Sequence, residues 1–408
     1  MVLRTLVLAL CLVLTGQAHA QQLAAAPQSS AEIAELRAQV RALMDRINEL
    51  EKKQAEQAKT IKPPSVETPR SKLSMSGYAQ MRMFHSGLPS SGATPTQSFS
   101  NRRTRLAMDY RVSPRTRGFI QTDFSGVSSD GSVSLRDAYI DVDANAFGYR
   151  IGQQKFPLVI ETDDNDLVVW TLERALTSTR LMPNERDRGV MFTLRDKSKD
   201  ALPLTLSLGA LNGNSINVGS TLAAPVLFGG LHYDTPRLEA RLWAETGEFK
   251  SAAPSPILRG PRQRLALSAR ANLGNQVVPE QGKFGYRFSL MGAWARGRGD
   301  YPSRNNVNAG GLLTAGSLVY TANPVGGWYV EPVWMVTKDP FPIRLIGRYE
   351  VYDTNRDAAF SKIHQSFTGL GFDVTKSLRF IAGYTFKTDQ TLNPSRHRAI
   401  TLETQLAF

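Results

Sequence analysis

Residues Arg398–Phe408 read R-A-I-T-L-E-T-Q-L-A-F, and their side chains alternate between two kinds. One face of the alternation holds Ile400, Leu402, Thr404, Leu406 and Phe408. The other face holds Ala399, Thr401, Glu403, Gln405 and Ala407. A period of two predicts a β-strand with one apolar and one polar face. A soluble domain rarely ends on such a strand, so the surroundings of its apolar face decide the fold.

The N-terminal residues have the organisation of a secretory signal peptide, which we expect at residues 1–20. Arg4 supplies the positive charge, Leu6–Leu14 is the apolar stretch, and Ala18-His19-Ala20 is the A-x-A cleavage site. Nine apolar residues are too few to cross a bilayer as a helix. We therefore expect the chain to be exported and its mature form to begin at Gln21.

Cys11 is the only cysteine, and it lies inside the expected signal peptide. A lipoprotein signal is the alternative at this position, but the large Leu10 before it disfavours that interpretation. The mature chain is then expected to contain no disulfide and no cysteine-bound metal.

Composition favours a transmembrane β-barrel. After the signal peptide no segment has 18 consecutive apolar residues, although 41% of the chain is hydrophobic and only 21% is charged. A barrel reconciles these observations, because only every second residue of a strand faces lipid. A C-terminal Phe on the last strand also resembles the signal that the assembly machinery of outer-membrane barrels reads. We expect an all-β protein in a bacterial outer membrane.

Alternating segments recur from Leu73 onward, and Leu202–Ala210 is the clearest of them. A direct count finds 17 candidate strands. Both ends of the barrel chain should lie in the periplasm, which requires an even number of strands. Treating Leu313–Thr321 as loop, or merging it with the next strand, gives 16 antiparallel strands over residues 72–408. The strand boundaries between residues 297 and 336 stay open.

The connection after the fifth expected strand, Pro157–Asp187, is the longest of the barrel. A loop of this length is usually functional or disordered. Its segment Leu167–Leu176 is too apolar for an exposed loop and could form a short helix. We predict that residues 157–187 fold inward and constrict the pore. The alternative is a loop lying across the outer mouth.

Residues 21–59 are expected to form a periplasmic helix, with a coiled coil from about residue 31 and a Pro-rich linker at 60–71. The heptad seam consists of Ile33, Leu36, Val40, Leu43, Ile47 and Leu50. β-branched residues at position a favour two strands, whereas Arg46–Glu51 resembles the R-h-x-x-h-E motif of three-stranded coils. We predict a homotrimer. The alternatives are a dimer, or one amphipathic helix packed on its own barrel.

If the apolar faces of the strands meet lipid, the opposite faces line the lumen and carry many arginines. These are Arg103, Arg105, Arg111, Arg117, Arg150, Arg241, Arg264, Arg270, Arg287, Arg344, Arg348 and Arg379. The main acids on the same faces are Asp109, Asp123, Glu239, Glu245 and Glu350. Guanidinium groups bind phosphate and carboxylate well and raise the local concentration of anions. The alternative is that these arginines pair with the acids and brace the wall.

The chain has a net charge of +13; Arg4 contributes one of these charges and residues 31–72 contribute two, which leaves +10 for residues 73–408. This excess fits either a cationic pore or a basic rim near acidic lipid and lipopolysaccharide headgroups. No nucleic-acid motif accompanies it, so we expect no nucleic-acid partner.

Enzyme motifs are missing from the sequence. The mature histidines, His85, His232, His364 and His397, show no metal-ligand spacing. G-x-S-x-G, P-loop and H-E-x-x-H motifs are absent. We expect no enzyme, cofactor or metal. The remaining alternatives to a channel are a barrel enzyme with dispersed catalytic residues and a structural tether whose stalk binds peptidoglycan.

Several segments together resemble the phosphate-selective porins O and P. They are Arg102–Tyr110 (RRTRLAMDY), Val133–Ile140 (VSLRDAYI), Ile151–Pro157 (IGQQKFP), Glu173–Leu176 (ERAL), Arg186–Met191 (RDRGVM), Arg344–Glu350 (RLIGRYE) and Phe367–Asp373 (FTGLGFD). The resemblance spans the barrel and implies a trimer of 16-stranded barrels. It also implies that the third extracellular loop constricts each pore and that small anions such as phosphate pass along an arginine-rich wall.

Carried over residue by residue, the resemblance makes Arg103, Arg105, Lys155 and Arg174 contacts for anions. The chain departs from the family in the acidic cluster Glu161–Asp166 of the constricting loop. Its constriction acids, Asp163, Asp164 and Asp166, would repel anions unless wall arginines pair with them. The sequence therefore favours a general or anion-preferring porin over a strict phosphate channel.

Overall fold

The computed structural model divides the chain into two compact units, Met1–Thr68 and Pro69–Phe408. It describes residues 38, 41–42, 44–46, 49, 72–86, 96–124, 133–181, 186–196, 198, 201–213, 216–217, 225–250, 259–300, 321–338, 341–390 and 395–408. In the first unit the described residues are helical and exposed. The predicted signal peptide, heptad seam and linker lie outside the described residues.

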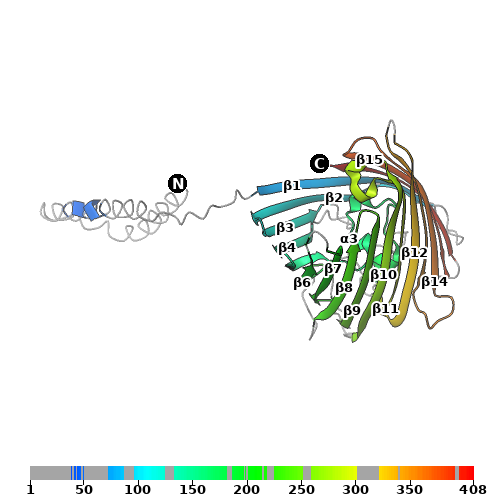
Figure 1. The fold of residues 1–408 in the computed structure, drawn as a ribbon, viewed down its shortest axis with the longest axis horizontal. Coiled ribbons are helices and arrows are strands. Elements are labelled where there is room, and N and C mark those ends of the chain that lie inside the picture. The colour runs from blue at the N-terminus through cyan, green and yellow to red at the C-terminus, as the bar shows by residue number, and fades with distance from the viewer. Residues whose placement is uncertain are drawn as a thin grey trace, which may run out of the picture. The chain divides into compact units, whose positions relative to one another are not determined.

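The second unit is a closed antiparallel barrel of sixteen strands, as predicted (Figure 1). The strands are β1 (Lys72–Ser86), β2 (Thr96–Ser113), β3 (Thr116–Asp123), β4 (Ser134–Ala144), β5 (Phe147–Lys155), β6 (Arg186–Arg195), β7 (Leu204–Leu211), β8 (Val226–Asp234), β9 (Leu238–Lys250), β10 (Arg259–Gln276), β11 (Tyr286–Asp300), β12 (Thr321–Thr337), β13 (Ile343–Asp353), β14 (Lys362–Asp373), β15 (Leu378–Asp389) and β16 (Ser395–Ala407). Each strand pairs with its sequence neighbours, and β1 pairs with β16.

The terminal strand closes the barrel as its alternation predicts. Ile400 is 51% exposed on the outer face of β16, whereas Thr401 and Glu403 are buried on the inner face. The backbone of Phe408 exchanges two hydrogen bonds with Gly77 of β1, with N–O distances of 2.8 and 2.9 Å. Pairing the last strand with the first leaves no open sheet edge.

The uncertain strand count between residues 297 and 336 is settled by direct pairing. β11 ends at Asp300, β12 begins at Thr321, and these two strands are hydrogen-bonded to each other. No further strand therefore lies between them in the barrel wall. Most of the extra candidate, residues 313–320, falls outside the described residues.

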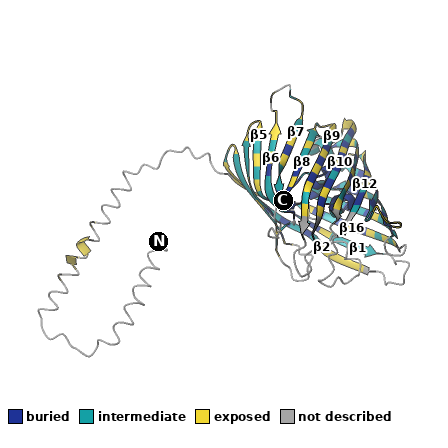
Figure 2. Ribbon diagram, turned by 90° about the horizontal axis from the view of Figure 1, so that it is seen from below, coloured by how far each residue is buried: buried dark blue, intermediate teal, exposed yellow. Residues whose placement is uncertain are grey.

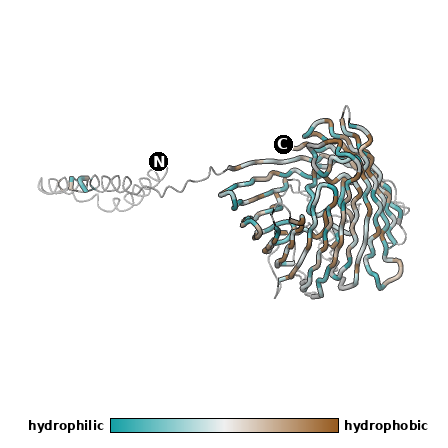
Figure 3. Tube along the Cα trace, viewed as in Figure 1, coloured by the Kyte–Doolittle hydropathy of each residue, from teal (hydrophilic) through white to brown (hydrophobic). Residues whose placement is uncertain are grey.

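The two faces of the wall differ as the period of two requires. Buried and exposed residues alternate along strands such as β9 and β10 (Figure 2). Large apolar residues are exposed on the outside, and hydrophobic colour recurs along the strands (Figure 3). Trp294, Trp328 and Trp334 of β11 and β12 are among these exposed residues, and aromatic residues at the rims of a lipid-facing band form the usual interfacial girdle. In the part of the chain that the structure describes, no helix is long and apolar enough to span a membrane.

The segment between β5 and β6 lies inside the barrel, and we call residues 156–181 the inner loop. It contains α3 (Ile160–Asp163), the 3₁₀ helix η1 (Asp166–Val168) and α4 (Leu176–Leu181). α3 contacts β9 and β10, whereas α4 contacts β11, β12 and β13. The loop therefore crosses the lumen to the wall opposite its origin, instead of covering the mouth.

The short helix suggested for Leu167–Leu176 is wrong for most of that segment. Only a single 3₁₀ turn overlaps its start, and α4 begins at its last residue. Trp170 and Leu172 pack instead into the wall beside Ile346, Phe367 and Ile381. This tertiary packing of the two side chains on the wall outweighs helix propensity.

Candidate functional site

Apolar packing anchors the first part of the inner loop. Phe156, Leu158 and Ile160 are almost completely buried, in one cluster with Phe228 and Trp243 of the wall. The ring of Phe156 meets Phe228 edge-on with centroids 5.1 Å apart, and Phe228 stacks on Trp243 at 4.6 Å. Aromatic pairs in these arrangements add to the stabilisation from burial alone. Apolar packing therefore holds this part of the loop in place independently of its charges.

Trp170 anchors the second part of the loop between two wall arginines. The guanidinium carbons of Arg344 and Arg379 lie 4.2 and 3.7 Å from the indole ring. Asp373 accepts hydrogen bonds from Arg344 at 2.8 Å and from Arg379 at 2.5 Å. Arg379 also donates to the backbone oxygen of Leu167. Arg344, predicted to line the pore, therefore holds the loop against β13 and β15.

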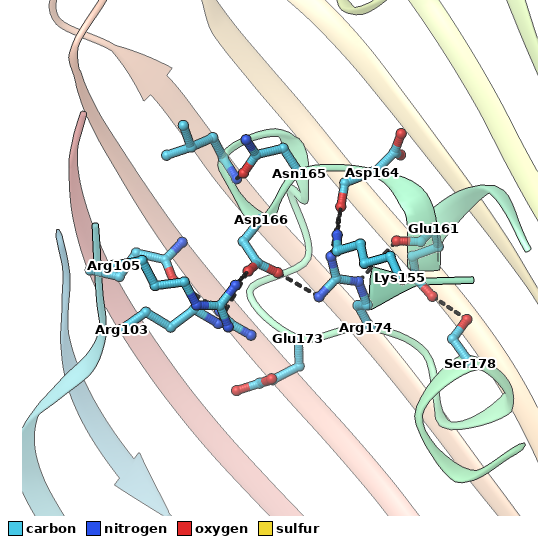
Figure 4. A network of polar contacts seen from close by, with 12 residues as sticks. Arg103, Arg105, Lys155, Glu161, Asp164, Asn165, Asp166, Glu173, Arg174 and Ser178 are labelled. Carbon is cyan, nitrogen blue, oxygen red and sulfur yellow. Dashed lines mark hydrogen bonds and ion pairs between the residues drawn. The ribbon is translucent and has the colours of Figure 1, made fainter. Parts of the chain in front are cut away.

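Asp166 connects the loop to β1 and β2 (Figure 4). Its carboxylate pairs with Arg105 of β2, and with Arg174 of the loop at 2.5 Å. Arg103 lies 3.6 Å away, and the Tyr78 hydroxyl donates a hydrogen bond at 2.7 Å. Burial raises the pKa of Asp166, but the guanidinium groups around it outweigh burial and hold the pKa well below its usual range.

Glu173 forms a second connection to the same wall. Arg102 donates two hydrogen bonds to its carboxylate at 2.9 and 2.8 Å, and Arg82 donates one at 2.5 Å. The side chain of Glu173 is 46% exposed to the lumen. Burial raises the pKa of Glu173, but Arg102 and Arg82 outweigh it and lower the pKa well below its usual range. Leu172, with a φ of 66°, turns the chain so that Leu172 packs on the wall while Glu173 faces the arginines.

A β-bulge places an extra arginine in this group. On β1, Gln80 pairs with Arg103 and the next residue, Met81, pairs with Asn101, so Arg102 has no partner in the register. A bulge of this kind re-aims a side chain that strict alternation would place on the other face. As a result, Arg102 and Arg103 both approach the inner loop although they are adjacent in sequence.

These contacts define a cationic face, built from β1, β2 and the inner loop, to which the end of β5 contributes Lys155. Its cations are Arg82, Arg102, Arg103, Arg105, Lys155 and Arg174. Its carboxylates are Asp123, Asp166, Glu173 and Glu403. Six cations against four carboxylates leave an excess of two positive charges. Lys155 donates to the backbone oxygen of Asp164 at 2.7 Å.

The other two constriction acids are also paired with the wall. Asp163 lies 2.7 Å from Arg241, and Asp164 pairs with Arg270. Burial raises the pKa of Asp163, but Arg241 outweighs it and the pKa falls; for Asp164, burial outweighs Arg270 and the pKa rises. The acidic residues that depart from the porin O and P pattern are therefore paired with arginines of the wall.

The charged groups of β12 and β13 that contact α3 and α4 are arranged differently. Arg348 lies 3.2 Å from Glu161 of the loop, 3.8 Å from Glu331 of β12 and 3.4 Å from Glu350 of β13. All four side chains are buried. We call this group the carboxylate cluster. One guanidinium faces three carboxyl groups, so the excess here has the opposite sign from that of the cationic face.

The remaining predicted arginines lie away from the inner loop. Arg117 and Arg150 share Asp141, each at 3.1 Å, near the barrel end where β1 begins and β16 ends. Arg264 pairs with Glu245 at 2.9 Å and braces the wall. Arg287 is exposed at the start of β11. These four residues do not join the group around the constriction.

Sequence reasoning missed five residues of the site: Arg82, Arg102, Trp170, Glu173 and Glu331. Arg82 and Glu331 have the alternation of inward-facing residues, so a fuller count would have found both. Arg102 needed knowledge of the bulge. Trp170 and Glu173 needed the path of the inner loop, which leaves no signature in local periodicity.

Among the residues that the structure describes, one group of side chains has the composition of a cation site. The ligand atoms of His232, Asp234 and Glu239 lie within 4.8 Å of one another. Glu239 already accepts hydrogen bonds from Arg270 at 2.9 Å and from Lys283 at 2.7 Å. Two protein cations therefore neutralise the best ligand of the group, which argues against a metal there.

Comparison with known proteins places the fold among outer-membrane porins. No model of a known protein family matches the chain, and no curated protein matches its sequence. The outer-membrane channel DcaP of Acinetobacter baumannii is similar in structure, with a TM-score of 0.61 and 14% identity over 83% of this chain and 97% of that one. An anion-selective porin from Comamonas acidovorans has a TM-score of 0.57 and 13% identity over 83% of this chain and 100% of that one.

The outer-membrane protein OmpT of Vibrio cholerae, solved in a trimer form, has a TM-score of 0.53 and 11% identity over 83% of this chain and 99% of that one. At identities this low the likeness concerns the fold alone. The porin O and P family is not among these similar structures.

Proposed function

We propose that this chain is a bacterial outer-membrane porin that forms a water-filled, anion-preferring channel for small solutes such as phosphate. The observation that carries the proposal is the inner loop, which crosses a closed sixteen-stranded barrel and is held by inward-facing arginines of the wall. A barrel of this strand number leaves an aqueous lumen, and a loop inside it sets the narrowest section. The similar folds of outer-membrane porins support the same function.

Anion preference rests on where the two charge excesses lie. The positive excess borders the lumen through Arg82, Arg102 and Arg103, whose side chains are 10%, 19% and 10% exposed. The negative excess of the carboxylate cluster is buried beneath the loop, at most 4% exposed for each carboxyl residue. Ions in the lumen therefore meet the cationic face more directly, and a positive potential raises the local concentration of anions.

A general porin with little selectivity is the second candidate. The pairing of Asp163, Asp164 and Asp166 with wall cations favours it, because paired charges cancel at a distance. The two candidates differ in reversal potential and not in conductance.

Planar-bilayer recording tests the proposal. We expect single-channel current steps. In a potassium chloride gradient, the sign of the reversal potential should show that chloride is more permeant than potassium. A zero or cation-side reversal potential would refute anion preference and leave a general porin. Absence of conductance would refute the porin itself.

Adding phosphate to the same recording tests whether this anion binds in the channel. Phosphate bound at the cationic face should reduce chloride current, because the bound anion occupies the narrow section. Sulfate at matched ionic strength is the control for divalent anions in general. Chloride current that phosphate leaves unchanged would remove phosphate from the proposal.

We further propose that three copies associate and that the N-terminal stalk supports the trimer, with lipopolysaccharide around the barrels and peptidoglycan as a partner of the stalk. The R-h-x-x-h-E segment at Arg46–Glu51 supports the trimer. Chemical crosslinking of the mature chain and of a variant lacking residues 31–59 tests it. Crosslinked trimers that persist at full yield in the variant would show that the stalk is dispensable.

A further inference from the structure

Within the carboxylate cluster, Glu331 is the carboxyl group with the fewest hydrogen-bond donors. Glu161 accepts from the backbone N–H of Ala175 at 3.0 Å and from the Ser178 hydroxyl at 2.5 Å. Glu350 accepts from the backbone N–H of Leu176 at 2.5 Å and from Gln365 at 2.7 Å. Glu161 and Glu350 therefore have the donors that an ionised carboxylate needs.

Among the described residues, the one hydrogen-bond partner of Glu331 is the hydroxyl of Thr171 in the inner loop, at 3.4 Å. That hydroxyl carries one proton, and its better acceptor is the backbone oxygen of Glu173 at 2.9 Å. Arg348 also donates to the Thr171 oxygen, at 2.7 Å. If Thr171 gives its proton to Glu173, only a protonated Glu331 can complete the contact, by donating to Thr171.

The balance of charges also favours a proton on Glu331. Arg348 alone cannot neutralise three carboxylates, and a buried charge without a partner costs several kcal/mol. The other charged or titratable groups that act on Glu331 are Arg270 from β10 and Asp164 from the loop, with Tyr329 beside it on β12. Arg270 is already engaged by Asp164 and Glu239. No described cation is therefore left to neutralise Glu331.

A bound metal ion is a poorer explanation than a proton. Arg348 occupies the space that the three carboxyl groups share, within 3.8 Å of each of them. A metal ion would have to displace this guanidinium or be repelled by it, whereas a proton adds no volume.

We propose that a proton resident on Glu331 at neutral pH latches the inner loop onto β12 and β13, and that its removal in alkaline solution releases the loop. On ionisation, Glu331 loses its hydrogen bond to Thr171 and faces Glu161 and Glu350 across one guanidinium. The loop carboxylate Glu161 is then repelled by Glu331 of the wall, which weakens the docking of the loop. This inference rests on the proposed function, because the loop whose docking it regulates sets the pore.

The loop carboxyl group of the cluster responds in the same direction. Burial raises the pKa of Glu161 above its usual range, and Arg348, Ser178 and Arg174 oppose that rise only in part. A group whose pKa is higher in the docked loop than in the released loop favours docking while it is protonated. That contribution is present below the ordinary pKa of Glu and is lost as the pH rises through the raised value. A proton on Glu161 therefore favours docking in the same direction as the proton on Glu331.

Amide hydrogen exchange of the full mature chain, measured by mass spectrometry at neutral pH and at about pH 10, tests the latch, because about pH 10 exceeds the values documented for buried Glu. Glu331→Gln keeps the shape of the protonated side chain and removes its titration. At about pH 10 we expect inner-loop amides to exchange about tenfold faster in wild type than in E331Q, with equal rates at neutral pH. Comparing the two chains at one pH cancels the intrinsic pH dependence of exchange.

Glu245→Gln is the matched control, since Glu245 is a buried wall carboxylate that pairs with Arg262 at 2.8 Å and Arg264 at 2.9 Å. E245Q should behave like wild type at both pH values. Equal exchange of wild type and E331Q at about pH 10 would overturn the latch, whether both loops stay protected or both are released.

Infrared spectroscopy keeps the test decisive if E331Q does not fold. Wild type at neutral pH should show a carboxylic-acid C=O band that disappears by about pH 10, and E350Q should retain this band. A wild-type spectrum without that band at neutral pH would overturn the latch. Bilayer recording separates the two proposals: absence of current would refute the porin alone, and unchanged exchange in a conducting channel would refute the latch alone.

Discussion

The inner loop is held by two walls that carry opposite excesses of charge. On the cationic face, six basic side chains surround four carboxylates, and Asp166 has cations on several sides. On the carboxylate cluster, one guanidinium serves three carboxyl groups. Both are ionic contacts between the same loop and the same barrel, yet their tolerance of pH and of mutation should differ.

The difference shows that an ionic contact is defined by the balance of its charges as much as by its geometry. A carboxylate among excess cations stays ionised in acid, whereas a carboxyl group among excess carboxylates keeps its proton toward alkaline pH. The loop is thus fixed on one side by charges and on the other by a proton. Between them, three acids and three cations are balanced, namely Asp163, Asp164 and Glu239 with Arg241, Arg270 and Lys283.

The largest expected effect comes from removing the single cation of the carboxylate cluster. Arg348→Ala leaves three buried carboxyl groups without their neighbouring cation, which should weaken loop docking by about 3–5 kcal/mol. Exchange of inner-loop amides measures this opening free energy. Arg195→Ala, which breaks an exposed pair with Asp143, is the control and should cost no more than about 1 kcal/mol. Docking as strong in R348A as in R195A would show that the cluster does not hold the loop.

Asp166→Asn disrupts the contact between the inner loop and the cationic face, and the expected loss of docking free energy is smaller. The amide keeps the shape and one acceptor, so we expect docking to weaken by about 1–3 kcal/mol. The positive excess also rises by one charge, so the reversal potential should move further toward the anion side. Asp141→Asn makes the same change where Arg117 and Arg150 meet, away from the loop. A cation-side shift in D166N would contradict the assignment of the cationic face.

Arg102, at the β-bulge of β2, should influence the ion selectivity of the channel more than the stability of loop docking. Arg102→Ala removes a partly exposed charge from the cationic face, and we expect the anion-to-cation permeability ratio to fall roughly threefold. Arg111→Ala, an exposed arginine of the same strand away from the loop, should leave the ratio nearly unchanged. Equal ratios in R102A and wild type would remove Arg102 from the ion path.

The smallest expected effect is the response to mild acid. Because surrounding arginines lower the pKa of Asp166, its carboxylate favours docking above its ordinary pKa and loses that contribution only as the pH falls through the lowered value. The difference in reversal potential between wild type and D166N should therefore be the same at neutral pH and at about pH 5. A difference that shrinks over this range would mean that Asp166 takes up a proton early.

Much of the wall could be predicted residue by residue, whereas the loop could not. Alternation correctly placed Arg103 and Arg105 on the inner face, since inward and outward positions follow from a period of two. The same rule failed at Arg102, where a bulge adds one residue to β2. It gave no information on Trp170, whose contacts depend on which wall the loop reaches.

The sequence by itself determined the barrel, the parity of its strands and the position of the long inner loop, because alternation and loop length are properties of neighbouring residues. Only the tertiary structure decided which charges meet, because Glu161, Glu331 and Arg348 come from distant segments that barrel closure brings together. It also decided the sign of each excess. That sign depends on counting partners in space, since a buried charge responds to the groups around it and not to its neighbours in the chain.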